Sequence, residues 1–98
     1  MKHFIVDLDY RIPAEQIGDV LTEHRAFLKK GYDQGRLLCS GPKVPKTGGV
    51  IIAKAPSLAA LQEFFQDDPY VVKGIADYRY IEFDPVLRQA WLDDWVLT

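Results

Sequence analysis

The sequence has one cysteine, little net charge and no long hydrophobic run, and each shortage excludes a class of protein. With Cys39 alone, neither an intrachain disulfide nor a CxxC or Cys/His zinc framework can form, which favours a reducing compartment. A net charge of -2 gives no field to hold a polyanion, so nucleic-acid binding is not expected. No apolar stretch approaches membrane-spanning length, and Asp7 comes too early for a signal sequence. We therefore expect a cytoplasmic protein that binds no membrane.

What the chain does contain is the composition of one globular domain. Of its 98 residues, 48% are hydrophobic and 27% are charged. A domain of this size buries only about two-thirds of the surface of its extended chain, so its core is modest and association with a second copy is a natural supplement. Cys39 lies in an apolar segment, where we interpret it as a packed small hydrophobic residue.

Hydrophobic periodicity predicts four strands and two helices, in the order strand, helix, strand, strand, helix, strand. The first helix opens at Pro13 and continues to Gly31 or Gly35, and the second is capped by Ser57 and ends before Pro69. This order is the split βαβ arrangement of α+β proteins called ferredoxin-like. The strands are expected at residues 3–9, 36–40, 49–53 and 76–84.

Two features of the pattern point beyond a single chain. Neither middle strand alternates cleanly, which indicates that both faces of the sheet are covered, one by helices and the other most simply by a second subunit. The tail, residues 85–98, carries Leu87, Trp91 and Trp95 four residues apart, a spacing that predicts one side of a short helix. These side chains either cover a gap in their own domain, or contact the partner chain or roof a pocket, and both interpretations stand.

A histidine interrupts the apolar stripe of the first predicted helix. His24 occupies a position where that stripe calls for another apolar residue, so its ring should face the interior. Histidine titrates near neutral pH and acts as a general base when another group fixes its tautomer. The alternative is a buried histidine that is satisfied by a backbone carbonyl. The stripe consists of Ile17, Val20, Leu21, Phe27, Leu28 and Gly31.

Asp68 is the second candidate. Because it precedes Pro69, its carboxylate is suited to capping or turning the backbone. Neither residue indicates chemistry alone, but the two together with the glycine signals between them favour a site.

Short motifs recur in order from the first predicted helix to the last predicted strand. They are His24-Arg25-Ala26-Phe27-Leu28, Gly35-Arg36-Leu37-Leu38 with Ser40-Gly41-Pro42, Gly48-Gly49, and Asp67-Asp68-Pro69-Tyr70 with Gly74. In order and spacing they resemble the YCII-like family of small dimeric α+β barrel proteins. The resemblance covers residues 1–84 and leaves the tail outside. It implies a ferredoxin-like fold, a homodimer formed by sheet-to-sheet packing, and a site that contains His24 and Asp68.

The same resemblance implies a function. One characterised type in the family is a dehydrochlorinase that acts on a chlorinated hydroxyquinol, so we expect a lyase- or isomerase-like enzyme without a cofactor, acting on a small metabolite. His24 would remove a proton, Asp68 would orient the imidazole, and Ser40 and Tyr78 would bind the substrate. Ser40 as a turn residue and Tyr78 as a strand aromatic are the alternatives. A non-catalytic module that binds a small ligand, or a regulatory dimer, is the competing function.

A metal site is not expected. His3, Asp7 and Asp9 share one face of the first predicted strand, but three residues along a strand are too far apart to converge on an ion. We interpret them as part of a solvated or interface face.

Overall fold

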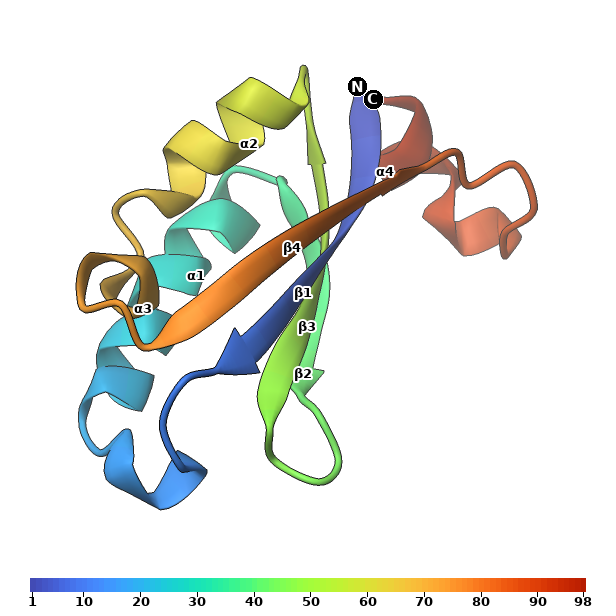
Figure 1. Cartoon of the computed structure of the whole chain (residues 1–98). Helices are drawn as coiled ribbons and strands as arrows, with labels where there is room; N and C mark the ends of the chain where they lie inside the picture. The colour runs from blue at the N-terminus through green and yellow to red at the C-terminus, as the bar shows by residue number, and fades with distance from the viewer.

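A four-stranded antiparallel sheet forms the centre of the molecule, and a computed structural model describes all 98 residues of it (Figure 1). The strands lie in the order β2-β3-β1-β4, and every neighbouring pair is antiparallel. This is the ferredoxin-like α+β topology that the sequence predicted. The strands are β1 (Lys2–Tyr10), β2 (Leu37–Pro42), β3 (Gly48–Ala55) and β4 (Ala76–Phe83).

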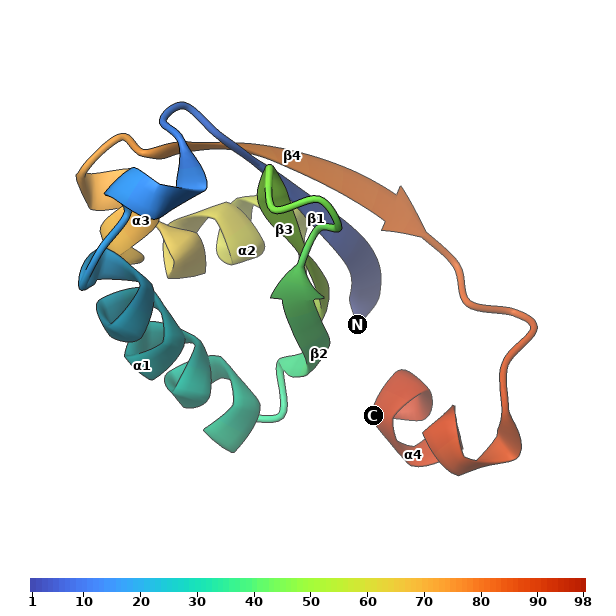
Figure 2. The same cartoon turned by 90° about the horizontal axis from the view of Figure 1, so that it is seen from below.

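Helices cover one face of the sheet, and Figure 2 shows them on that side from a second direction. They are α1 (Val20–Asp33), α2 (Leu58–Phe65) and α3 (Pro69–Val72), with a 3-10 turn η1 (Ala14–Gln16) before α1. Ser57 caps α2 as expected, because its side chain accepts a hydrogen bond from the Ala60 amide at 3.1 Å. No helix combines the length and the hydrophobicity needed to cross a bilayer.

The first helix begins later than predicted, and one short helix was not predicted at all. Gly18 adopts a φ of 58°, a left-handed conformation that separates η1 from α1. At the other boundary, α2 ends at Phe65, and Asp68 caps the next helix, since its side chain accepts from the Tyr70 amide. The chain therefore resumes a helix at Pro69, where proline fits the first turn.

The core lies between the sheet and these helices. Alternate residues of β1 point into it, and Phe4, Val6 and Leu8 are each at most 1% exposed. Side chains from β3 and the helices complete the cluster, among them Ile51, Ala53, Phe27, Leu28, Leu61 and Phe65. Two helices and a sheet thus enclose one continuous apolar layer.

The opposite face of the sheet carries the other half of each alternating strand. The register aligns Ile5 with both Ile52 and Ile81, so an aliphatic row crosses this face. Ile81 is 42% exposed. Cys39 also belongs to this face and is exposed, so its interpretation as a packed residue is wrong. A bulge after Leu37 sets the local register of β2 and places Cys39 opposite Ile52.

The tail folds back on the side of the sheet away from α1 and α2 (Figure 1). It consists of a 3-10 turn η2 (Ala90–Leu92) and a short helix α4 (Asp93–Leu97), not one helix with three apolar residues along one side. Leu87 and Trp91 are 93% and 76% exposed. Trp95 alone returns to the domain, and its indole N–H donates to the Gly35 carbonyl at 2.9 Å. Of the three apolar residues only Trp95 lies in α4, since Leu87 belongs to the loop before η2 and Trp91 to η2 itself.

Candidate functional site

The structure brings His24 and Asp68 into direct contact. The imidazole of His24 projects inward from α1, and Asp68 stands at the junction of α2 and α3. Nδ1 of His24 lies 2.8 Å from Oδ1 and 3.0 Å from Oδ2 of Asp68. His24 is 7% exposed and Asp68 is fully buried. Forty-four residues separate the pair in sequence, so the fold and not local structure creates this contact.

Three donors converge on the Asp68 carboxylate. Besides Nδ1 of His24, the Tyr70 amide donates to Oδ1 at 3.0 Å and the Tyr78 hydroxyl donates to Oδ2. Burial, together with the negative charge of Asp68, raises the pKa of Tyr78 well above its ordinary value, so its phenol remains a donor. An ionised carboxylate can only accept hydrogen bonds. The hydrogen of a neutral His24 therefore sits on Nδ1, and the lone pair of Nε2 is left available.

The plane of the imidazole is fixed by Tyr70. The two rings are stacked with centroids 3.9 Å apart and planes within 4° of each other. Tyr70 is 1% exposed, and its position follows from the cap that Asp68 provides to α3. One short helix thus supplies both the carboxylate that orients the ring and the aromatic surface that holds it.

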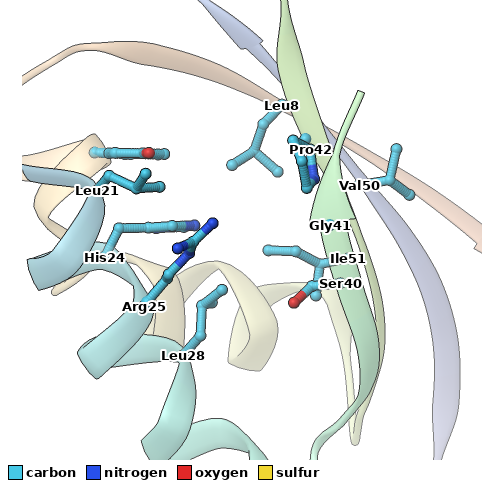
Figure 3. Close-up of a pocket in the computed structure, with 12 residues that line it drawn as sticks. Leu8, Leu21, His24, Arg25, Leu28, Ser40, Gly41, Pro42, Val50 and Ile51 are labelled. Atoms are coloured by element: carbon cyan, nitrogen blue, oxygen red, sulfur yellow. The ribbon is translucent and has the colours of Figure 1, made fainter. Parts of the chain in front are cut away.

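A cavity of about 150 Å³ opens beside His24, between α1 and the strands β2 and β3. Its size is similar to that of a protein cavity that holds one benzene molecule. Figure 3 shows His24 and Arg25 extending toward it from α1, with Ser40 facing it from β2. No hydrogen bond within the chain occupies Nε2 of His24, so this nitrogen is free to meet a molecule in the cavity. The remaining lining residues are mainly apolar: Leu8, Leu21, Leu28, Gly41, Pro42, Gly49, Val50, Ile51 and Tyr70.

The predicted substrate-binding residues occupy different places. Ser40 lines the cavity, and its hydroxyl lies 2.7 Å from that of Tyr32. Tyr78 does not line it, because its hydroxyl turns toward Asp68 behind the imidazole. Sequence reasoning missed Arg25 and Tyr70 as site residues. Arg25 directly follows His24, and Tyr70 stands two residues after Asp68. Nothing in the sequence pattern indicates, however, that Tyr70 stacks on an imidazole or that a guanidinium lies at the cavity.

The charged residues of β1 lie on the opposite face and take no part in this cavity. Lys43 pairs with Asp7 at 2.5 Å and with Asp9 at 2.7 Å, and Arg79 reaches Asp7 at 2.7 Å. The hydrogen bond from Lys43, followed by that from Arg79, lowers the pKa of Asp7. These carboxylates therefore form ion pairs across neighbouring segments.

Comparisons with known proteins agree with this fold. A family model described as the YCII-related domain matches residues 1–84. The proteins called YciI from Escherichia coli O6:H1 (strain CFT073) and from Shigella flexneri are each 35% identical over 95 residues, covering 87% of this chain and 95% of the relative. Among solved structures, 5-chloro-2-hydroxyhydroquinone dehydrochlorinase (TftG) from Burkholderia phenoliruptrix AC1100, in complex with 2,5-dihydroxybenzoquinone, is similar with a TM-score of 0.67. That alignment has 20% identity and covers 83% of this chain and 90% of TftG. At this identity the likeness to TftG shows the fold.

Proposed function

The chain belongs to the YCII-related family, and on that premise we propose that it is an enzyme that uses no cofactor and removes a proton from a small hydroxylated aromatic compound. His24 is the general base and Asp68 is the residue that orients it. The reaction is of the lyase type, in which loss of the proton accompanies loss of a leaving group such as chloride. TftG, named for such a reaction, has the same fold.

The observation that carries this proposal is that the two nitrogens of His24 have different environments. Nδ1 is held by the buried carboxylate of Asp68, while the ring lines a cavity the size of one aromatic ring. A base needs a fixed tautomer and a free lone pair, and this arrangement supplies both. The Asp68 carboxylate, which is fully buried and accepts several hydrogen bonds, also stabilises the imidazolium that forms when Nε2 accepts a proton.

The proposed step balances without an oxidant or a reductant. In the keto tautomer of the substrate, one hydroxyl has become a carbonyl and its hydrogen has moved to the ring carbon that bears chlorine. Nε2 of His24 takes the proton of a remaining ring hydroxyl, and the electron pair of the broken O–H bond forms a new C=O bond. The adjacent C=C pair shifts to the chlorine-bearing carbon and chloride leaves with the pair of the C–Cl bond, so the substrate loses HCl and becomes a hydroxyquinone. The imidazolium then returns its proton to water. In this proposal Ser40, which lines the cavity, hydrogen-bonds a substrate oxygen, and Tyr78 donates to Asp68 on the side away from the cavity.

A homodimer is part of this proposal. The face of the sheet opposite the helices presents an aliphatic row at Ile5, Ile52 and Ile81, and a second copy would cover it. The single exposed Cys39 on that face fits a reducing, cytoplasmic setting.

The test is chloride release from 5-chloro-2-hydroxyhydroquinone, measured by ion chromatography under anaerobic conditions. The chain offers a matched control, because it has two histidines and His3 lies on β1 away from the cavity. We expect His24→Ala to reduce release to the rate without protein, and His3→Ala to retain it. The unchlorinated hydroxyquinol reports any background oxidation.

Two results would count against catalysis. Equal chloride release by the wild type and His24→Ala would remove His24 as the base. Tight binding of the compound without turnover by the wild type would favour the competing function, a module that binds a small ligand.

A further inference from the structure

One arginine at the cavity has no partner within the chain. Three of the five arginines form ion pairs, and Arg36 lies over the ring of Phe64 at 5.3 Å. Arg25 makes no ion pair and no hydrogen bond to another side chain, although α1 carries acidic neighbours. The three paired arginines are Arg11, Arg79 and Arg88.

The guanidinium of Arg25 extends toward the cavity beside the ring of His24 (Figure 3). No aspartate or glutamate is among the residues that line this cavity. The nearest carboxylate of the site, Asp68, is fully buried behind His24 and already accepts three hydrogen bonds. The charged group that a bound molecule meets is therefore positive, and the other lining residues are mostly apolar.

We propose that Arg25 makes this cavity selective for planar ligands that carry a negative oxygen, such as an ionised hydroxyquinone, a phenolate or an aromatic carboxylate. This inference deepens the proposed function by naming its substrate class. A guanidinium presents a rigid fork of N–H donors that matches two adjacent oxygens, and an unpaired one gains most from an anion. The apolar walls then contact the ring while Arg25 holds its charged edge.

Anion binding by Arg25 and proton removal by His24 together require one orientation of the ligand. An oxygen bound by Arg25 at the mouth and a ring seated among Leu21, Leu28 and Ile51 leave a second ring substituent facing Nε2 of His24. The positive charge also favours the ligand after it has lost a proton to His24. Arg25 is thus a specificity residue, and His24 remains the base.

The test uses two pairs of probes, each made of an anion and a neutral molecule with the same ring. Benzoate is compared with benzamide, and 2,5-dihydroxybenzoquinone, which is ionised at neutral pH, is compared with 2,5-dimethoxybenzoquinone. Affinities are measured by calorimetry at pH 7.5 and low salt. Because the exposed thiol of Cys39 can add to quinones, the quinone pair is measured in a Cys39→Ser background.

We expect the wild type to bind each anion about tenfold more tightly than its neutral match, the value of one charge-assisted contact at a partly exposed site. Arg25→Gln should abolish that preference and leave the affinity for the neutral probes unchanged, while Arg25→Lys should keep part of it. Lys30→Gln removes the same charge from an exposed position of α1 outside this cavity and should keep the full preference.

Equal affinity for anion and neutral probe in the wild type, or no binding of either anion, would overturn the inference. Retention of the full preference by Arg25→Gln would overturn it as well. Since these readouts require no turnover, a wild type that binds anions through Arg25 but releases no chloride would refute the proposed reaction alone. Conversely, the chain could release chloride equally fast with and without Arg25→Gln and bind the anionic and neutral probes equally well. That result would refute the role of Arg25 alone and leave the proposed reaction standing.

Discussion

The hydroxyl of Tyr78 donates to Oδ2 of Asp68, on the same carboxylate that holds His24. Tyr78 comes from β4, whereas His24 comes from α1, so the carboxylate ties the last strand to the first helix. A substitution of Asp68 therefore removes contacts to both α1 and β4. The arrangement couples the orientation of the imidazole to the packing of the sheet edge.

Asp68→Asn should change the tautomer of His24 and lower stability. An amide offers one acceptor and one donor group where the carboxylate offers two acceptors, so its NH₂ group can face Nδ1 and leave the hydrogen on Nε2. We expect the free energy of unfolding to fall by about 2 kcal/mol, because the carboxylate accepts charge-assisted hydrogen bonds in a buried place. Urea denaturation measures the loss, and ¹⁵N NMR of the histidine rings reports the tautomer. His3 serves as the internal control in the same spectrum. An unchanged His24 tautomer would contradict the conclusion that Asp68 holds the hydrogen of His24 on Nδ1.

Tyr78→Phe and Ser40→Ala should separate positioning from substrate contact. Tyr78 does not line the cavity, so removal of its hydroxyl should lower kcat with little change in KM, and cost about 1 kcal/mol of stability. Ser40 does line it, so Ser40→Ala should mainly raise KM. Steady-state kinetics with the chlorinated hydroxyquinol distinguishes them. A higher KM for Tyr78→Phe with kcat unchanged would instead place Tyr78 in contact with the substrate.

Periodicity and turn chemistry were sufficient to predict the order of the four strands and the two longer helices along the chain and the inward direction of His24. They failed where a single backbone conformation decides the outcome. Gly18 divides the first helical segment by a positive φ, and Asp68 restarts a helix that Pro69 was expected to end. The partner of His24 followed from the family resemblance, because a contact across 44 residues leaves no periodic signal. The tail was mispredicted since three apolar residues at helical spacing do not show which of them finds a surface.

Gly48→Ala should destabilise the sheet beside the cavity. A Cβ at Gly48 would overlap the backbone carbonyl of Leu8 on β1, and backbone in a paired strand cannot move aside cheaply. We expect a loss of about 2 kcal/mol or more in the free energy of unfolding, the usual scale for overpacking. Gly41→Ala is the matched control, because nothing lies within 4 Å of its added Cβ. Equal urea midpoints for the two variants would refute the predicted overlap.

Stability should decrease below neutral pH through His3. Burial, assisted by the positive N-terminal amino group, lowers the pKa of His3 below its ordinary value of 6.5. The unfolded chain then binds a proton that the folded chain resists, so this contribution is complete above pH 6.5 and declines as the pH falls toward the folded-state pKa. Urea midpoints at pH 7.5 and 5.5 should therefore differ more for the wild type than for His3→Gln. Identical pH dependence in both proteins would exclude His3 as the cause.

Trp95→Ala should release the tail, while Trp91→Ala should not. Trp95 donates to the Gly35 carbonyl, lies with its ring centroid 5.6 Å from that of His3, and has the ammonium of Lys54 5.0 Å from its ring centroid. The Lys54 ammonium also donates to the Trp95 carbonyl at 2.7 Å, so tail and sheet are joined at both backbone and side chain. We expect a loss of about 2 kcal/mol for this half-buried indole, below the cost of a fully buried one. Trp91 is 76% exposed, and its removal should leave the urea midpoint unchanged.

Limited proteolysis provides the second measurement, because a released tail is cleaved after residue 84 faster than the folded domain. Equal cleavage of the two variants would show that Trp95 does not hold the tail.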